Sequence, residues 1–310
     1  MRTVQPKQHA YVINSVYDLE LTDGERFILK VQFWKAAQDW NLQTSHYIIQ
    51  RLQQIQGVPV ASFCRYDNEG DILPHPYLLS NKLPGQHGDE FFQQTGHTDR
   101  VYVSAEMGHV LGLIHDLPID AAAPLGPDLN QWRQVVADAL EGDPVFKAEL
   151  DALKPDFFPR FHLLLKTIDA PAIEQQAVPL WLEGALHNVL VQPGNGQPVI
   201  SGLYDFQACG RGSRLFNFAF TLDNIIKVNL RCGQEANPQS LFDADAYSDA
   251  FYQAYQATGN PLPRYTDWQR TLVEIVRLSH GGIRHWWDCL GVVHRKTAEW
   301  LENIIEGLER

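Results

Sequence analysis

Three polar residues in the second half of the chain have the types and the order of a phosphoryl-transfer site. In the segment WLEGALHNVLV, residues 181–191, the carboxylate of Glu183 precedes the amide of Asn188 by five residues. Asp205 follows in LYDFQ, 17 residues after Asn188. Because the first acid is a glutamate and Trp181 stands two residues before it, the segment leaves open whether the site works or is the remnant of one.

The composition predicts a folded chain with about two domains or lobes. It has 310 residues, 45% of them hydrophobic, and no long low-complexity segment. The four cysteines lie far apart and show no zinc-like spacing, which excludes a disulfide framework. The first 20 residues lack the apolar core of a secretion signal, and no apolar run of about 18 residues occurs. We therefore expect a cytoplasmic protein without a membrane partner.

The net charge of −12 is unevenly distributed along the chain. Residues 1–85 hold eight Lys/Arg and eight Asp/Glu, whereas residues 86–310 hold 17 and 29, which accounts for the whole surplus. A nucleic-acid partner is not expected, since phosphate binding needs a basic surface. The acidic surplus either serves solubility or attracts a cationic substrate.

The elements that position these residues begin with a β-rich segment. Residues 11–21 and 25–33 are rich in β-branched and aromatic residues around the turn Thr22–Gly24, which predicts a hairpin. Residues 36–55 have apolar residues at helical spacing and end at Gly57, which predicts a helix. Two more strands are expected over residues 58–66 and 76–83.

The rest of the chain is expected to be mostly helical. Residues 84–89, PGQHGD, predict a hinge and a boundary between domains 1–83 and 84–310. Helices are expected over residues 99–117, in two or more pieces over 129–170, and in three pieces over 243–310. Two short apolar runs around the turn QPGNGQP, residues 192–198, predict a small hairpin that carries the polar residues.

The order of these pieces resembles the aminoglycoside phosphotransferase and choline kinase superfamily, which has a protein-kinase-like fold. The resemblance runs from about residue 8 to residue 290. It implies an α+β, two-lobed fold, with a small antiparallel sheet and one main helix in the first lobe and a larger, mostly helical second lobe. The chain is then a divergent member of that superfamily.

The resemblance implies a nucleotide site in the first lobe. Lys30 in FILKV is similar to the strand lysine that neutralises the phosphates of ATP, although a solvated strand lysine is the alternative. Asn14 ends the segment that matches the nucleotide-covering loop. Asn81 and Leu83 lie in PYLLSNKLPG, which is similar to the segment whose backbone meets the adenine. His115 matches a family histidine and is expected to be structural.

The resemblance also assigns roles to the polar residues. The family loop reads His-Gly-Asp, four residues, then Asn; its Asp accepts the proton of the substrate hydroxyl and its Asn holds a metal ion. Without gaps, Glu183 matches that Asp and Asn188 matches that Asn. A rival alignment that deletes two residues places Ala185 at the Asp position, which leaves no base. Asp205 matches the Mg²⁺-binding Asp.

The departures from the family pattern reduce charge around the expected site. No glycine precedes Gly24, so the nucleotide-covering segment lacks the glycine that would bring its N–H groups close to phosphate. The predicted helix 36–55 has Asp39 as its one acid, and the expected partner of Lys30 falls near Ser45 or His46. Trp181 replaces the loop histidine. Two later family acids correspond to Ser213 and Asn217.

Taken with the resemblance, the sequence predicts an enzyme that uses ATP and Mg²⁺ to phosphorylate a hydroxyl of a small, cationic molecule. Glu183 and Asp205 are the expected catalytic residues, and Asn188 and Asp205 the expected metal ligands. The alternative is a kinase-like protein whose catalysis has decayed and which binds a nucleotide, a small molecule or a partner. A third possibility is a different reaction on ATP.

Overall fold

The structure, a computed structural model, forms two compact units. The first comprises residues 1–128, 178–211 and 224–260, and the second comprises residues 129–177, 212–223 and 261–310. The expected division between residues 83 and 84 falls inside the first unit and stays a prediction. The structure describes residues 3–7, 14–33, 41–70, 72–126, 128–129, 159, 177–222, 224–225 and 244–260.

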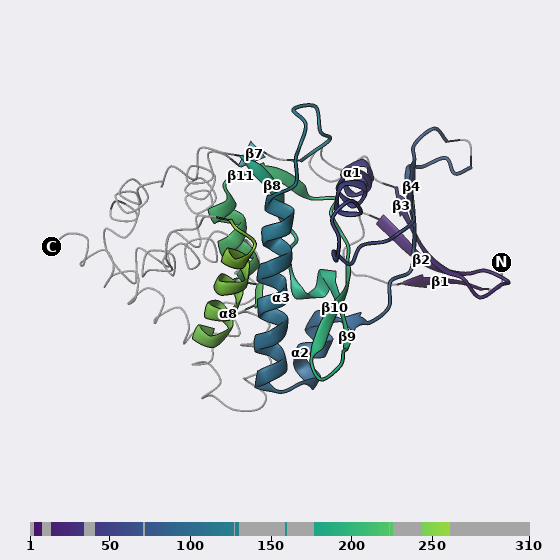
Figure 1. The fold of residues 1–310 in the computed structure, drawn as a ribbon. Helices are drawn as coiled ribbons and strands as arrows, with labels where there is room; N and C mark the ends of the chain where they lie inside the picture. Colours follow the sequence, from purple (N-terminus) through teal and green to yellow (C-terminus); the bar gives the residue numbers. More distant parts are fainter. Residues whose placement is uncertain are drawn as a thin grey trace. The chain divides into compact units, whose positions relative to one another are not determined.

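A five-stranded antiparallel sheet holds the N-terminal strands in the order β1-β2-β3-β5-β4 (Figure 1). The predicted hairpin is confirmed, with its turn around Gly24. The strand expected over 76–83 forms as β5, whereas the one expected over 58–66 begins only at Cys64, as β4. β1 was not expected, because its sequence TVQPK does not alternate and contains proline; an edge strand tolerates proline. The strands are β1 (Thr3–Lys7), β2 (Asn14–Glu20), β3 (Arg26–Gln32), β4 (Cys64–Asp67) and β5 (Tyr77–Asn81).

Helix α1 (Leu42–Leu52) lies between β3 and β4 in the sequence and is shorter than the predicted helix. Its first turn is capped by Asn41, whose side chain accepts a hydrogen bond from the Thr44 N–H at 2.7 Å. Apolar residues at helical spacing are buried on one face, among them Leu42, Ile48 and Leu52. Residues 36–40 of the predicted helix lie outside the described residues.

The segment predicted as a hinge, residues 84–89, includes a short strand and the start of a helix, and its role as a hinge stays a prediction. β6 (Gln86–His87) pairs antiparallel with Leu190 and Val191, and α2 (Gly88–Gln94) follows at once. Gly88 permits a close approach, since a Cβ there would lie 2.6 Å from the Leu186 carbonyl oxygen. The glycines of this segment therefore serve close packing.

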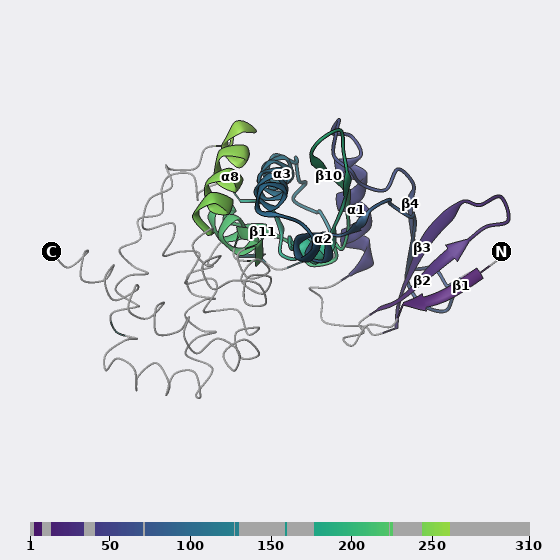
Figure 2. The ribbon, with the colours of Figure 1, turned by 90° about the horizontal axis from the view of Figure 1, so that it is seen from below.

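Two long helices pack side by side in the first unit, as both views show (Figures 1 and 2). They are α3 (His97–His115), which confirms the predicted helix, and α8 (Ala244–Ala257). Gly108 brings their backbones together, because a Cβ on it would lie 2.1 Å from the Phe251 carbonyl oxygen. His115 is buried and its Nδ1 lies 2.6 Å from the Tyr255 hydroxyl, as fits a structural histidine.

The predicted hairpin around residues 192–198 is confirmed and carries the polar residues at its ends. β9 (Val189–Pro193) and β10 (Pro198–Leu203) pair antiparallel and with β6 form a three-stranded sheet. The turn closes through a 2.9 Å hydrogen bond from Gly194 N to Gln197 O. Asn188 directly precedes β9, and Asp205 follows β10 by two residues.

A third sheet has the order β7-β11-β8 and supports the ends of the same loops. β8 (Val178–Trp181) leads into the loop that contains Glu183, and β11 (Cys209–Gly212) follows the loop that contains Asp205. β7 (Asp128–Leu129) is a two-residue strand. The two segments WLEGALHN and YDFQ are thus each fixed by a strand on both sides.

In the second unit the described residues include a helical stretch at 214–222 with a buried apolar face. The predictions for residues 130–158, 160–170 and 261–310 lie outside the described residues. In the described part of the chain, no helix is long and apolar enough to cross a membrane.

Candidate active site

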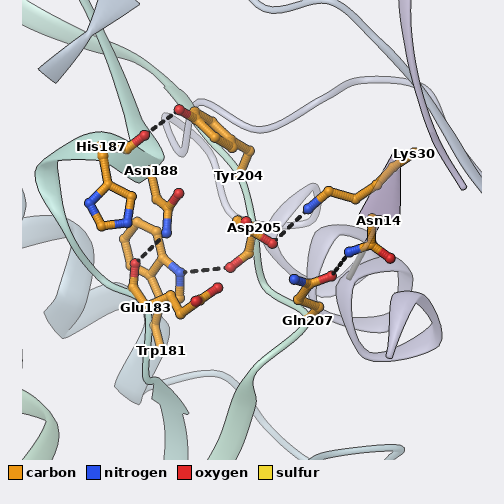
Figure 3. A network of polar contacts seen from close by, with 9 residues as sticks. All are labelled: Asn14, Lys30, Trp181, Glu183, His187, Asn188, Tyr204, Asp205 and Gln207. Carbon is orange, nitrogen blue, oxygen red and sulfur yellow. Dashed lines mark hydrogen bonds and ion pairs between the residues drawn. The ribbon is translucent and has the colours of Figure 1, made fainter. Parts of the chain in front are cut away.

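The loop between β8 and β9 is closed by its own hydrogen bonds. The N–H groups of Gly184 and Ala185 donate to Trp181 O and Glu183 O at 3.0 and 2.7 Å. The Asn188 side chain, 4% exposed, donates from Nδ2 to Glu183 O at 2.9 Å. Glu183 and Asn188 are therefore held in a fixed relation across one turn of chain (Figure 3).

Asp205 is held from several directions in the loop after β10 (Figure 3). Its backbone has φ 62°, the left-handed region in which a non-glycine residue is uncommon. The Trp181 Nε1 donates to the Asp205 carbonyl oxygen at 3.4 Å, and the Trp181 ring packs on Phe206. The Asp205 carboxylate forms a 2.7 Å ion pair with the Lys30 ammonium group from β3.

The Glu183 carboxylate lies close enough to this ion pair to be affected by both charges. Burial, and secondly the charge of Asp205, raise the pKa of Glu183 to about 8, while Lys30 acts in the opposite direction. One carboxylate oxygen, Oε2, is buried without a hydrogen-bond partner among the described residues. Ala185 is 3% exposed. The structure thus brings the side chain of Glu183 into the surroundings of Asp205, while the choice between the two alignments stays a prediction.

A tyrosine connects the metal-site candidates to each other. The Tyr204 N–H donates to the Asn188 carbonyl oxygen at 3.2 Å, and its hydroxyl donates to the carbonyl oxygen of His187. The hydroxyl also lies 2.6 Å from Nδ1 of His87 at the end of β6. Burial and the carboxylates of Asp205, Asp89 and Glu90 raise the pKa of Tyr204, so its hydroxyl keeps its proton.

An uncharged contact lies beside the ion pair. Asn14, at the start of β2, donates from Nδ2 to Oε1 of Gln207 at 2.7 Å (Figure 3). Gln207 is 5% exposed, and its backbone carbonyl accepts a 3.3 Å hydrogen bond from Asn41 N, the residue that caps α1. The loop 205–207 is thereby connected to β2, β3 and α1.

The comparison with family models decides what kind of protein carries this arrangement. The model of the phosphotransferase enzyme family, APH, matches residues 9–271. The chain belongs to this phosphotransferase family. No curated protein sequence matches it. The assignment as a divergent member, and as an enzyme of the kinase and phosphotransferase kind, is confirmed.

Solved structures of phosphotransferases share the fold at low sequence identity. A putative aminoglycoside phosphotransferase from Ralstonia eutropha JMP134 has a TM-score of 0.63 at 13% identity, with 98% of this chain and 93% of that chain covered. The macrolide 2'-phosphotransferase MphH from Brachybacterium faecium has 0.59 at 16%, with 96% and 91% covered. Amicoumacin kinase hAmiN, solved with AMP-PNP, Ca²⁺ and amicoumacin, has 0.55 at 14%, with 98% and 88% covered. The expected α+β, kinase-like fold is confirmed.

Two of the residues expected at the nucleotide take part in other contacts. The Asn81 side chain accepts from Phe63 N at 2.9 Å, and the Asn81 N–H donates to Phe63 O at 3.2 Å. Leu83 packs over Gly202, whose Cβ, if present, would lie 3.0 Å from the Leu83 Cβ. Their contact with adenine stays a prediction, as does the contact of Asn14 with the nucleotide.

The oxygen atoms at this site suit a magnesium ion that is held mainly by phosphates. Carboxylate and amide oxygens are its preferred protein ligands, and one or two of them suffice beside a nucleotide. The Asn188 Nδ2 already donates to Glu183 O, which leaves the amide oxygen as the ligand atom. Among the described residues, no three His, Cys, Asp or Glu side chains are grouped to hold a metal by themselves. Asp205 and Asn188 therefore fit a metal that arrives with its nucleotide.

Sequence reasoning missed three residues that build the site: Tyr204, Gln207 and His87. Tyr204 and Gln207 flank Asp205 in YDFQ, so their proximity in sequence was the available signal. His87 lies 117 residues from Tyr204 and reaches it only because β6 pairs with β9. No local sequence pattern predicts that pairing.

Proposed function

We propose that this phosphotransferase moves the γ-phosphoryl group of ATP to a hydroxyl of a small molecule with the help of Mg²⁺. The observation that carries the proposal is the Lys30–Asp205 ion pair beside Glu183, one of whose carboxylate oxygens has no hydrogen-bond partner among the described residues. A cation for phosphate, an anion for metal and a candidate base are what phosphoryl transfer requires of a protein. The AMP-PNP in the amicoumacin kinase structure and the GDP in structures of aminoglycoside 2'-phosphotransferase-IIIa support a nucleotide.

Each residue has one task in this scheme. Lys30 binds the phosphates, while Asp205 and Asn188 hold Mg²⁺, which supplies positive charge against the transferred group. Glu183 orients the acceptor hydroxyl and takes its proton on a carboxylate oxygen. The acceptor oxygen forms a bond to the γ-phosphorus as the bond from that phosphorus to the bridging oxygen of ADP breaks.

The acceptor is proposed to be cationic. The acidic surplus of the chain lies entirely after residue 85, where acceptor-binding residues of this family are expected. The neighbours in the structure comparison act, by their names, on macrolides, aminoglycosides and amicoumacin. These names support a small-molecule acceptor.

A binding protein without catalysis is the second candidate function. The observation in its favour is that Lys30 has Asp205 as its partner, while α1 contains no acid to hold Lys30 in place. Thermal unfolding with ATP, with and without Mg²⁺, tests both candidates, because specific binding at 100 times the Kd stabilises by about 2.7 kcal/mol. Stabilisation together with ADP formation supports the enzyme, and stabilisation without ADP formation supports the binding protein. If neither occurs, both candidates fail.

A further inference from the structure

The loop 205–207 has two different connections to the N-terminal sheet, one charged and one neutral. The charged connection joins Lys30 of β3 to Asp205 at 2.7 Å. The neutral connection joins Asn14 of β2 to Gln207, also at 2.7 Å. Val16 stands opposite Lys30 and Asn14 stands opposite Gln32, so both connections start from the same end of one hairpin.

The Lys30–Asp205 ion pair must break during the reaction that we propose. Lys30 must turn its ammonium group to the nucleotide phosphates, and Asp205 must turn its carboxylate to the metal. The ion pair that aligns the hairpin with this loop then opens at the moment when alignment is needed. In protein kinases a glutamate of the helix holds the lysine, but α1 of this chain, LQTSHYIIQRL, has no acid.

The Asn14–Gln207 hydrogen bond does not need to break during the reaction. A carboxamide pair carries no charge that phosphate or metal would attract, and Gln207 is 5% exposed. The Gln207 carbonyl also accepts from Asn41 N at the start of α1. One buried residue thus connects the loop of Asp205 to both β2 and α1, the two elements that flank Lys30 in the sequence.

We propose that Gln207 and Asn14 are positioning residues that keep Lys30 and Asp205 aligned after their ion pair opens. This inference rests on the proposed function. Neither residue takes part in the chemistry. Their hydrogen bond fixes the hairpin to the loop of Asp205, in place of a lysine–glutamate pair, for which the described helix α1 supplies no acid.

The test is a double-mutant cycle on Gln207→Ala and Asn14→Ala, with turnover of ATP at saturating Mg²⁺ as the readout. Each single variant is expected to lower kcat by about tenfold, since small misplacements reduce rates steeply. The double variant should lose no more than either single variant, because both remove the same bond. The KM for ATP should change less than kcat, as expected for a loss of alignment.

Gln53→Ala is the matched control, and unfolding temperatures separate positioning from folding. Gln53 also uses its amide within the first unit, donating to Ala61 O at 2.6 Å beyond the end of α1, and its loss should leave kcat unchanged. Should Gln207→Ala not fold, Asn14→Ala alone still has to show the loss of kcat. Unchanged kcat in the single variants, or a double variant whose loss is the product of both, would overturn the proposal. A wild-type protein without turnover would instead contradict the proposed function.

Discussion

In the ungapped alignment, Glu183 takes the place of the family aspartate and is one methylene longer. The longer side chain helps catalysis only if its carboxylate points toward the acceptor hydroxyl. Its Oε2 lies near Asp205 and has no hydrogen-bond partner among the described residues, so it can accept the proton of that hydroxyl. We expect Glu183→Gln to lower kcat by at least about 10²-fold with little change in ATP affinity, because a base acts on the chemical step. Steady-state kinetics with direct ATP binding measure both. Unaltered turnover would remove Glu183 from the mechanism and leave the site without a base.

The raised pKa of Glu183 gives the reaction a definite pH dependence. A base must be ionised, and burial with the Asp205 charge holds this carboxyl protonated up to about pH 8. The wild-type kcat/KM should therefore rise about tenfold per pH unit below this value and level off above it. A profile that is flat between pH 6 and pH 8 would contradict the assignment.

Because its pKa is raised in the folded protein, Glu183 lowers the free energy of unfolding at alkaline pH. The unfolded chain releases this proton near the ordinary value of 4.5, whereas the folded protein keeps it to about pH 8. In that window the folded state binds more protons, so the free energy of unfolding falls as pH rises. Glu183→Gln should be more stable than wild type by on the order of 1–3 kcal/mol at pH 8. Below pH 4.5 that excess should vanish, and urea unfolding at several pH values measures it.

The elements show why local patterns predicted some parts and failed at others. The hairpins and α3 were predictable because a turn or an apolar stripe lies within one short window of sequence. Strand β6 was not predicted, because it forms only by pairing with β9, about a hundred residues away. Asp205 and Asn188 were singled out by the family resemblance, and their roles stay predictions. Gln207 was not singled out, because its side-chain amide bonds to Asn14, which lies 193 residues away in the sequence.

The contact of α3 with α8 depends on the absence of a side chain at Gly108. A methyl group there would lie 2.1 Å from Phe251 O and 2.8 Å from Phe251 C, so backbone has to move. In a helix, alanine is more favourable than glycine by about 1 kcal/mol. Overpacking, however, destabilises a protein by about 1–3 kcal/mol, and a clash with backbone atoms is expected at the upper end of that range. We expect Gly108→Ala to lower Tm, with the neighbouring, exposed His109→Ala as the control. Equal Tm values for the two variants would contradict the packing account.

At the scale of the whole molecule, charge distribution predicts how the acceptor binds. All of the net −12 arises after residue 85. A cationic acceptor that is attracted by exposed carboxylates should bind more weakly as salt increases, because such attraction is screened over about 8–10 Å. Acceptor KM between 50 and 500 mM NaCl measures this, with the KM for ATP compared in parallel. An acceptor KM that does not change with salt would argue against the cationic class.

We propose above all that the site formed by Lys30, Glu183, Asn188 and Asp205 catalyses phosphoryl transfer. The most direct measurement is ADP formation from ATP and Mg²⁺, with and without amine-bearing sugar acceptors, by the wild type and by Asp205→Ala. We predict magnesium-dependent ADP formation by the wild type, faster with an accepted substrate, and a loss of at least about 10²-fold in a folded Asp205→Ala. A wild-type protein that ATP and Mg²⁺ stabilise against unfolding but that forms no ADP, or an Asp205→Ala variant as active as the wild type, would contradict this account.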